Sequence, residues 1–343
     1  MRLEDFDFDL PAELIAQEPA ARREDARLMI LDRAARVVSQ RPFTAITESF
    51  RAGDLLVAND TRVIPARLLG RKESGGRIEI FLVRRCVGEA ETWDCLSRSS
   101  KPPRGGSAVI FKDQRRAHFI EGGEPPLRRV CFEGGGDFMA WLEAQGEMPL
   151  PPYIRRPAGT LDRERYQTVF AREAGALAAP TAGLHFTPVI LDELQQRGVE
   201  LHALTLHVGL GTFLPVRVED PRQHRMHHET YQVPEATAAA VNRARREGRR
   251  VIALGTTSAR ALEAAADGDD RLAAGSGETD IFIYPGYRFR LVSGMVTNFH
   301  LPQSTLLMLV AALAGREFVL EAYRQAVAAR YRFFSYGDCM LVL

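Results

Sequence analysis

From about residue 153 to the C-terminus, the chain alternates between stretches typical of helices and stretches typical of strands. We predict helices over 188–197, 235–247, 258–266, 304–314 and 317–329, and strands over 199–208, 249–255, 279–286 and 339–343. The first helix has the clearest limits, because Thr187 can cap it, Pro188 suits its first turn and Gly198 follows its end. Such alternation indicates a parallel or mixed sheet with helices on its faces.

Residues 67–150 follow a different pattern. Short runs typical of β-strands recur at 77–86, 92–99, 107–113, 115–121 and 128–133. Closely spaced strands of this kind predict an antiparallel sheet or small barrel, and a proline-rich connector follows at 149–152. The expected fold class is therefore α/β, with a mixed or parallel sheet flanked by helices and built from residues 1–66 and 151–343. An antiparallel β-barrel-like domain of residues 67–150 is inserted into it.

Composition narrows the classes of protein to which this chain can belong. Its 343 residues are 45% hydrophobic and 26% charged with a formal net charge of +1, so any nucleic-acid binding has to use a local basic patch. The longest apolar run, 306–314, falls short of the about 20 residues that span a bilayer. The four cysteines form no C-x-x-C pair, and the acidic N-terminus does not resemble a secretion signal. We expect reduced thiols and a cytoplasmic location.

Polar residues stand next to small ones at four predicted strand-to-loop junctions. These are APTAGLHF (179–186), LHVGLGTF (206–213), GTTSAR (255–260) and TNFHLP (297–302). Each junction alone is weak, because a Gly-Thr-Thr-Ser turn often only caps a helix and a lone buried histidine is more often a core residue. The apolar run 55–58 also leads into the polar residues NDTR at 59–62. Since ligands collect outside the carboxyl ends of strands in α/β folds, the junctions together predict one polar site.

A histidine-rich stretch, His224, His227, His228 and Glu229, resembles a metal site at first sight. It lies in a loop after a proline, not on a helix, and zinc sites need a further ligand and a fixed second shell. We therefore expect no metal here, and prefer hydrogen bonding to a substrate or a purely structural loop.

Two basic groups are separated along the chain. One lies at the end of a predicted helix, where a solvated face would also explain it, and comprises Arg243, Arg245, Arg246, Arg249 and Arg250. The other lies in the loop 97–106 and comprises Arg98, Lys101 and Arg104. Two such patches suit a long polyanion better than a small phosphate. The aromatic stretch YRFFSYGD (331–338) can stack a base or cover a cation, although composition alone favours a core role.

Across nearly its whole length, the chain resembles the S-adenosylmethionine:tRNA ribosyltransferase-isomerase family of queuosine biosynthesis. The resemblance rests on DFDFDLPAELIAQEP (5–19), LLVANDTRVIPARL (55–68), LPPYIRRP (150–157), APTAGLHFT (179–187), TLHVGLGTFLPV (205–216), GTTSARALE (255–263), TDIFIYPGYRF (279–289), TNFHLPQSTLLMLVAALAG (297–315) and YRFFSYGD (331–338). The chain departs from residues common in the family at Leu210, Leu214 and His228, and at Ser99, Pro102 and Pro103 in the basic loop.

The resemblance implies an enzyme that transfers and isomerises the ribosyl group of S-adenosylmethionine. The acceptor would be a 7-aminomethyl-7-deazaguanine at the wobble position of tRNA, and the products epoxyqueuosine-tRNA, adenine and methionine. S-adenosylmethionine would be a consumed cosubstrate, with no cofactor, metal or membrane involved, and the protein a monomer. A non-catalytic tRNA-binding protein is the alternative. The sequence has no G-x-x-x-x-G-K-[ST] motif of a P-loop nucleotidase, and its G-x-G at 209–211 does not continue as a Rossmann motif. A methyltransferase would need a glycine-rich nucleotide loop, which we do not find.

This chemistry indicates roles for residues at the junctions. A sulfonium acidifies the adjacent C5′ proton, so the site needs a general base, together with a donor for the departing adenine. We expect His185, His207 and His300 in these acid and base roles. Substrate contacts are expected from Asp60, Thr61, Arg62, Thr181, Gly183, Gly209, Gly211, Thr212, His227, Glu229, Gly255, Thr256, Thr257, Ser258, Arg260, Tyr284, Asn298, Tyr336 and Asp338, the last two near the sulfonium. RNA contacts are expected from Arg98, Lys101, Arg104, Arg245, Arg246 and Arg249. The mechanism requires the histidines and the 256–258 turn to meet in one pocket.

Overall fold

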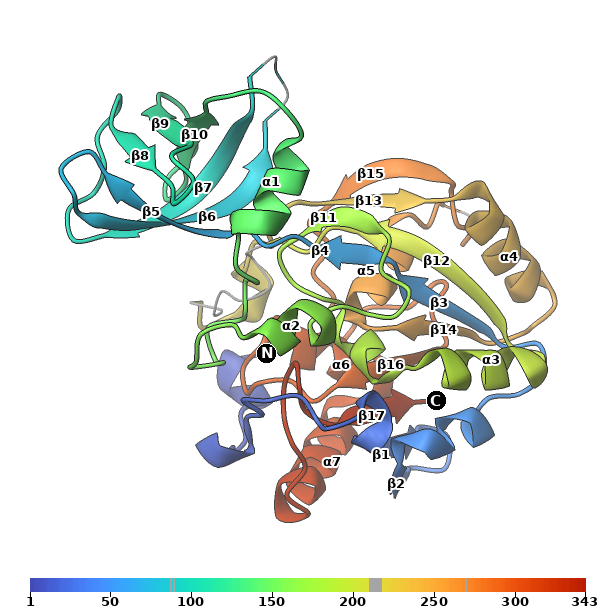
Figure 1. Ribbon diagram of the computed structural model, residues 1–343. Coiled ribbons are helices and arrows are strands. Elements are labelled where there is room, and N and C mark those ends of the chain that lie inside the picture. The colour runs from blue at the N-terminus through green and yellow to red at the C-terminus, as the bar shows by residue number, and fades with distance from the viewer. Residues whose placement is uncertain (87, 89, 210–217, 269) are drawn as a thin grey trace. The chain divides into compact units, whose positions relative to one another are not determined.

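The computed structural model describes residues 1–86, 88, 90–209, 218–268 and 270–343. The chain divides into two compact units (Figure 1). The larger unit consists of Met1–Arg62, Pro152–Arg156 and Glu164–Leu343, and the smaller of Val63–Pro151 and Pro157–Arg163.

The larger unit is built on a nine-stranded mixed sheet. In spatial order its strands are β15 (Gly275–Thr279), β13 (Glu229–Val233), β12 (Glu200–Leu206), β3 (Leu55–Asn59), β14 (Val251–Leu254), β16 (Gly294–Asn298), β17 (Cys339–Val342), β1 (Arg27–Asp32) and β2 (Val37–Pro42). The four central strands β12, β3, β14 and β16 are parallel neighbours, and β17 runs antiparallel to β16. The predicted fold class, a helix-flanked mixed sheet with an antiparallel barrel, is confirmed.

Both faces of this sheet are covered, because the central strands are apolar on both sides. Leu55 and Val57 of β3 pack into one core and Leu56 into the other. The first core is closed by α4 (Glu235–Arg246), α5 (Thr256–Ala264), α6 (Thr305–Ala314) and α7 (Arg316–Ala328). The second is closed by α3 (Pro188–Gln196) and the 3-10 helices η4 (Phe43–Ser49) and η5 (Thr181–His185). Strands buried on both faces are characteristic of parallel sheets.

The predicted limits of the helix at 188–197 correspond to α3. The Thr187 hydroxyl accepts a hydrogen bond from the Ile190 backbone N–H at 3.3 Å, and Pro188 occupies the first turn. Gly198, just beyond the end, has a φ of +83°, a conformation that glycine adopts without steric cost. Capping chemistry in the sequence therefore sets both ends of this helix.

The smaller unit is a closed six-stranded antiparallel barrel. Its strands are β10 (Arg128–Phe132), β7 (Thr92–Ser99), β6 (Arg77–Arg85), β5 (Arg67–Lys72), β8 (Ala108–Ile110) and β9 (Arg116–Ile120). Helix α1 (Phe138–Gln145) packs Phe138 and Trp141 against Phe132, with ring centroids 4.8 and 5.7 Å away. The remaining elements are β4 (Thr61–Val63), α2 (Thr160–Arg165), β11 (Glu173–Ala176) and 3-10 turns at Leu3–Phe6, Ala12–Leu14, Arg23–Asp25 and Pro221–Gln223.

One predicted strand, 279–286, is wrong. The strand β15 ends at Thr279, and no strand covers 280–286. The Ile281 N–H donates to the Thr279 hydroxyl at 3.1 Å, and its carbonyl accepts from Arg260 at 3.3 Å, so side chains satisfy this backbone in place of a ladder. The junction at 297–302 marks the end of β16, but the sequence delimits no strand before it. Gly294 of β16 lies so close to β17 that a Cβ would meet the Val342 carbonyl oxygen at 3.0 Å.

Within the described residues, no helix is long and apolar enough to cross a membrane. All four cysteines are free thiols; Cys95 and Cys339 are buried and Cys86 and Cys131 half-buried.

Candidate active site

The carboxyl ends of four neighbouring parallel strands bring polar residues to one edge of the large sheet (Figure 1). His207 follows β12, Thr61 follows β3, Thr256 follows β14 and His300 follows β16. All but the first of the sequence-predicted junctions, APTAGLHF, are therefore ends of adjacent strands. That first junction forms η5, on the face covered by the second core. The edge fits the usual position of ligand sites in α/β folds.

Asn59, at the end of β3, joins these strand ends. Its Nδ2 donates to the Leu206 carbonyl at 2.9 Å and to the Thr257 hydroxyl at 3.3 Å. Its Oδ1 accepts from the backbone N–H groups of Leu206 at 3.0 Å and Thr61 at 3.1 Å. This fully buried amide therefore holds β12, β3 and the start of α5 in register, and its role is structural.

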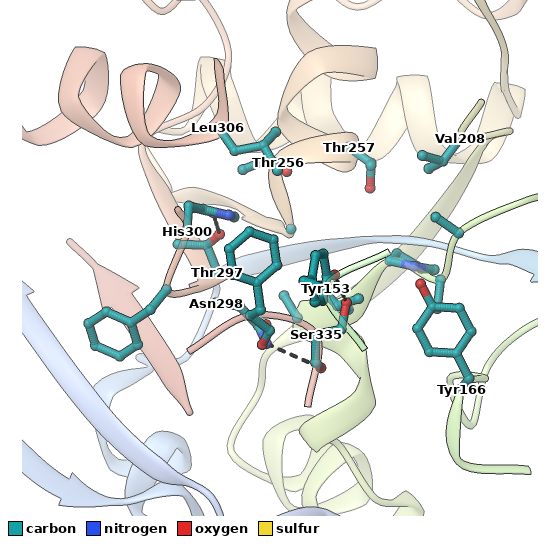
Figure 2. A pocket seen from close by; sticks show the side chains of 18 residues that line it. Tyr153, Tyr166, Val208, Thr256, Thr257, Thr297, Asn298, His300, Leu306 and Ser335 are labelled. Atoms are coloured by element: carbon teal, nitrogen blue, oxygen red, sulfur yellow. Dashed lines mark hydrogen bonds between the residues drawn. The ribbon is translucent and has the colours of Figure 1, made fainter. Parts of the chain in front are cut away.

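A partly open cavity of about 60 Å³ lies at this edge. Figure 2 shows Thr256 and Thr257 on one side of it, Tyr153 and Ser335 on the opposite side, and His300 and Tyr166 at its two ends. The rest of the lining consists of Ala178, Ala179, Pro180, Thr181, Ala182, Val208, Gly255, Thr297, Asn298, Phe299, Leu306 and Phe334. Gly255, with a φ of +93°, makes the turn from β14 into α5 that presents the two threonines.

Three buried polar atoms in and beside this cavity have no hydrogen-bond partner among the described residues. They are the Tyr166 hydroxyl and Asn298 Oδ1, which belong to lining residues, and Nε2 of His185, whose side chain adjoins Asn298. Buried polar groups without partners are rare in native proteins and each calls for an explanation. A bound polar molecule would supply the missing partners.

Phe334 lines the cavity with a backbone conformation that is unusual for an aromatic residue. Its φ is +73°, in the left-handed region. The strain is held by hydrogen bonds, because the Phe334 carbonyl accepts from Asn298 Nδ2 and from the Gly337 N–H, both at 2.8 Å. Its ring lies 4.0 Å, centroid to centroid, from that of Tyr153. Strain of this kind concentrates at functional sites.

His300 and His185 are both held neutral at pH 7 by burial. Burial lowers the pKa of His300 to about 3. It lowers the pKa of His185 to about 4, against smaller opposing effects of the Asp338 carboxylate and of Asn298. His300 is fixed by a 2.8 Å hydrogen bond between its Nε2 and the Thr297 hydroxyl, and its backbone N–H donates to the Tyr323 hydroxyl at 3.0 Å. Both rings are therefore neutral imidazoles at pH 7, so neither starts the reaction as an imidazolium acid.

His207 does not share this cavity. Its ring lines a second hollow of about 380 Å³, together with Glu173, Thr205 and residues of β13 and β15. Its Nδ1 is 2.8 Å from the Thr61 hydroxyl, which also donates to the Glu173 carbonyl at 3.3 Å. Burial lowers the pKa of His207, against the opposing carboxylates of Glu173 and Asp60. The expected single pocket therefore unites His300 with the threonine turn, and places His185 beside it and His207 outside it.

Glu229 and Arg260, both expected to contact substrate, bind each other. Glu229 Oε2 accepts from Arg260 Nη1, and each side chain is only 4% exposed. Glu229 Oε1 also accepts from the Gly209 N–H at 3.2 Å. One nitrogen of the pair, Arg260 Nη2, is buried without a partner among the described residues.

Three more predicted site residues are occupied by structural contacts. The Ser258 hydroxyl donates to the carbonyl of Leu254, the last residue of β14, at 2.8 Å. The Asp60 carboxylate accepts from the Thr205 hydroxyl at 2.7 Å and from Arg172 at 3.0 Å. Asp338 accepts from Arg27 and from the Arg332 N–H, and reaches the site only through its electrostatic effect on His185.

The other expected substrate residues are spread more widely. Gly183 is buried where a Cβ would meet Phe170 at 2.7 Å, and Tyr336 packs edge-on against Tyr166 with ring centroids 5.9 Å apart. Tyr284 is half-buried against Phe282, whereas Arg62 and His227 are exposed. Gly211 and Thr212 lie outside the described residues, as do the family departures Leu210 and Leu214.

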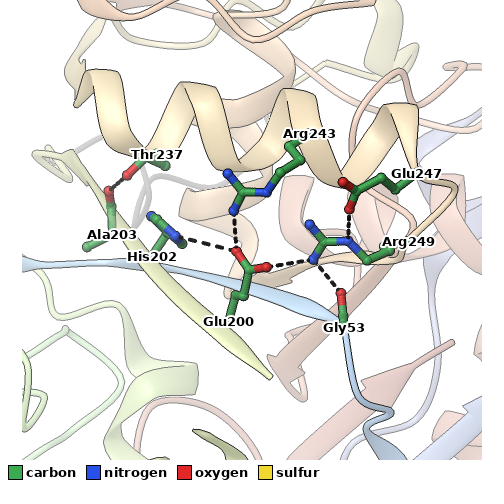
Figure 3. A network of polar contacts seen from close by, with 8 residues as sticks. All are labelled: Gly53, Glu200, His202, Ala203, Thr237, Arg243, Glu247 and Arg249. Carbon is green, nitrogen blue, oxygen red and sulfur yellow. Dashed lines mark hydrogen bonds and ion pairs between the residues drawn. The ribbon is translucent and has the colours of Figure 1, made fainter. Parts of the chain in front are cut away.

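The basic group at the end of α4 is partly consumed by a polar network (Figure 3). Glu200 accepts from Arg243 at 2.7 Å and from Arg249 at 3.0 Å, and Arg249 also donates to Glu247 at 2.6 Å and to the Gly53 carbonyl at 2.7 Å. The Arg249 guanidinium is therefore already bonded within the protein, which leaves it less available for the expected RNA contact. Arg245 and Arg246 remain exposed, as do Arg98, Lys101 and Arg104 of the barrel.

No group of three or more potential metal ligands occurs within the part of the chain that the structure describes. In the histidine-rich stretch, His224 packs edge-on against Phe282, His227 and His228 are exposed, and Glu229 is bound to Arg260.

The cavity residues not selected from the sequence include Tyr153, Tyr166, Phe334 and Ser335. Tyr153 and the 334–335 pair fall inside the motifs LPPYIRRP and YRFFSYGD, which could have indicated them. Tyr166 lies in a stretch with no periodicity or motif. Only its missing hydrogen-bond partner, visible in three dimensions, draws attention to it.

Comparisons with known proteins agree over the whole chain. A sequence model of a family described as queuosine biosynthesis protein matches residues 3–342. Proteins called S-adenosylmethionine:tRNA ribosyltransferase-isomerase from Syntrophotalea carbinolica and Geobacter sulfurreducens are 64% identical over 343 residues and 60% identical over 342, with 100% of each chain covered. A crystal structure of S-adenosylmethionine tRNA ribosyltransferase from Thermotoga maritima is similar at 39% identity and a TM-score of 0.56, covering 99% of this chain and 100% of that one.

Proposed function

The chain belongs to the queuosine biosynthesis protein family, and we propose that its reaction takes place in the cavity at the ends of β3, β14 and β16. It is an S-adenosylmethionine- and tRNA-dependent ribosyltransferase-isomerase, as its full-length relatives are named. We propose further that the enzyme transfers and isomerises the ribosyl group onto a 7-aminomethyl-7-deazaguanine at the wobble position of the tRNA. Epoxyqueuosine-tRNA, adenine and methionine are then the products. A monomeric state and a cytoplasmic location stay predictions.

The proposed location of the reaction rests on the polar atoms without hydrogen-bond partners that surround this one cavity. The Tyr166 hydroxyl and Asn298 Oδ1 belong to the cavity wall, and the Thr256 and Thr257 side chains line it from the start of a helix. The present volume of about 60 Å³ is well below the about 300–1,000 Å³ of pockets that enclose drug-sized ligands. The walls therefore have to move apart when S-adenosylmethionine binds, and the Tyr153–Phe334 pair is the aromatic wall that we expect to move.

His300 is the general base of this proposal. It lines the cavity, its ring is held by Thr297, and burial keeps it unprotonated at pH 7. Because a base works best with a pKa near the operating pH, substrate binding has to raise the pKa of His300 from the low value that burial gives it. The adjacent sulfonium of the substrate would acidify the C5′ proton that His300 removes. His185 does not reach the cavity, so we assign it a positioning role through Asn298.

Tyr166 is the donor for the departing adenine. Burial raises the pKa of its hydroxyl, so the group keeps its proton at neutral pH and can donate it. It lies in the same cavity as His300, at the opposite end, and makes no hydrogen bond of good geometry among the described residues, although Ser335 and the Ala179 backbone lie near enough to act on its pKa. The base and the donor thus come from side chains whose pKa values burial moves in opposite directions.

Adenine release tests the function. The parent protein, incubated with S-adenosylmethionine and tRNA carrying the 7-aminomethyl-7-deazaguanine, should release free adenine and methionine, measured by chromatography. His300→Gln should lower kcat by about 10²–10⁴-fold, the usual contribution of a general base. His202→Gln is the matched control, because His202 is also partly buried with a lowered pKa but lies outside the cavity lining. Wild-type kcat in His300→Gln would remove His300 from the mechanism.

The non-catalytic alternative predicts tRNA binding without adenine release, so the same assay separates it. It is not favoured, because the full-length relatives are named as transferases. For RNA contact we retain Arg98, Lys101, Arg104, Arg245 and Arg246, all exposed cations. Binding through phosphates predicts tRNA affinity that falls steeply with salt, and a flat salt response would remove these residues.

A further inference from the structure

A groove of about 1160 Å³ opens on the surface of the barrel. It is formed by β5, the start of β6, the end of β7, the end of β8 and the turn that follows β8. All of its lining residues belong to the smaller unit, so the groove is separate from the cavity of the larger unit.

Positive side chains dominate this groove. They come from three strands and the turn after β8, and are Arg71, Lys72, Arg77, Arg98 and Lys112. All are exposed except Lys72, which is half-buried. The Lys72 ammonium donates to the Lys101 carbonyl at 2.9 Å, so the loop that carries Lys101 and Arg104 adjoins the groove.

The acidic side chains of the groove do not balance these charges. Glu73 is 3.7 Å from Arg116, and Glu79 is 2.8 Å from Arg67, and neither arginine lines the groove. Glu79 stands opposite Arg98 in the β6–β7 ladder, yet its carboxylate turns to Arg67. Within the described residues, no carboxylate forms an ion pair with any of the five groove cations. They repel one another until an anion enters.

We propose that this groove binds the sugar–phosphate backbone of the tRNA substrate, away from the base that reacts. Five cations spread over four elements exceed what a single phosphate can neutralise, and match a run of phosphodiesters. Arginine and lysine suit phosphate oxygens, and Leu69, 51% exposed on the groove wall, offers an apolar contact for a ribose. The inference rests on the proposed function in taking tRNA as the polyanion.

The test compares the double variant Arg77→Gln/Arg98→Gln with the parent protein. Both arginines are exposed, so the barrel should keep its thermal unfolding temperature. We expect the Kd for tRNA to rise on the order of tenfold, and the slope of log K against log salt to lose about 1.4–1.8, or about 0.7–0.9 for each lost phosphate contact. The KM for tRNA should rise in parallel. The kcat for adenine release at saturating tRNA and the Kd for S-adenosylmethionine should not change. Arg41→Gln, an exposed arginine on β2 of the larger unit, should leave every value at that of the parent.

Unchanged tRNA affinity and salt slope in the double variant would overturn the groove assignment. So would a loss of binding to anionic phosphatidylserine vesicles with no change toward tRNA, since the groove would then be a membrane contact. If the parent protein releases no adenine but the double variant still loses tRNA affinity, the proposed function fails and the groove stands. If the parent protein releases adenine normally and the double variant binds tRNA like the parent, the proposed function stands and the groove assignment fails.

Discussion

The ion pair between Glu229 and Arg260 offers a sharp test of which polar residues are structural. Glu229 Oε2 binds Arg260, Oε1 accepts from the Gly209 N–H at 3.2 Å, and Arg260 also donates to the Ile281 carbonyl at 3.3 Å. Glu229→Gln keeps the size of the side chain and removes its charge. The Arg260 guanidinium, 4% exposed, then stays buried without its counter-charge.

The expected cost follows from that burial. Removing one partner of a buried ion pair destabilises a protein by about 3–5 kcal/mol. For a unit of this size, each kcal/mol lowers the unfolding temperature by about 2–4 °C, so the drop should lie between roughly 6 and 20 °C. Replacing both partners, as Glu229→Leu/Arg260→Met, removes the unpaired charge and should recover most of the loss.

Thermal unfolding followed by circular dichroism at pH 7 measures these differences. The matched control is Asp220→Asn, which breaks an ion pair to Arg222 whose side chains are 27% and 60% exposed. An exposed pair contributes about 0–1 kcal/mol, so this variant should unfold within a few degrees of the parent. If Glu229→Gln also unfolds near the parent and instead raises the KM for S-adenosylmethionine, the structural reasoning is refuted and Glu229 is a substrate residue.

Three other outcomes are expected from the structure. His185 and His300 protonate in the unfolded chain near pH 6.5 but in the folded protein only near pH 4 and 3, so their contribution to the free energy of unfolding is complete above pH 6.5. As the pH drops from 6.5 toward 4, each histidine lowers the free energy of unfolding by about 1.4 kcal/mol per pH unit. Urea denaturation between pH 7 and 5 would detect this decrease, and His300→Gln should show a shallower dependence of the free energy of unfolding on pH. Tyr166→Phe removes an unpaired buried hydroxyl, so stability should hold or rise while kcat falls by about 10²-fold or more; a loss of stability with full activity would contradict the donor role. Gly146→Ala places a Cβ 2.0 Å from a backbone oxygen and should destabilise the barrel by about 1–3 kcal/mol in urea, whereas Gly135→Ala, with nothing within 4 Å, should not.

The sequence predicts four strands of the large sheet, β3, β12, β14 and β17, because local chemistry and long-range packing agree there, but it does not delimit β1, β2, β13, β15 or β16. The sequence contains the cap, the proline and the terminal glycine of α3. The first four residues of β3, 55–58, are all apolar, as expected for a strand buried on both faces. The stretch 279–286 shows the opposite case. Its alternating isoleucines resemble a strand, but the backbone of Ile281 is satisfied by Thr279 and Arg260, contacts that no local pattern encodes.

In the candidate site, too, the sequence predicts what local motifs encode and misses what depends on distant contacts. Motif reading finds the strand ends, and therefore the edge at which His300, Thr256 and Thr257 meet. It cannot tell which polar groups are already satisfied, because the partners come from distant parts of the chain: Glu229 and Arg260 are 31 residues apart, and the Tyr153 hydroxyl meets that of Ser335 across 182.

Burying a polar side chain without a hydrogen-bond partner raises the free energy of the folded state. Most polar residues at the strand ends that a sequence search favours are therefore bonded within the protein. Ser258 and Glu229 are examples, each bonded within the protein. A group that awaits a ligand is the exception that keeps its bonding capacity, and it is identified by its missing partner. By that criterion Tyr166, which no motif marks, is a stronger candidate for contact with substrate than Ser258, which lies in one of the most recognisable motifs of the chain.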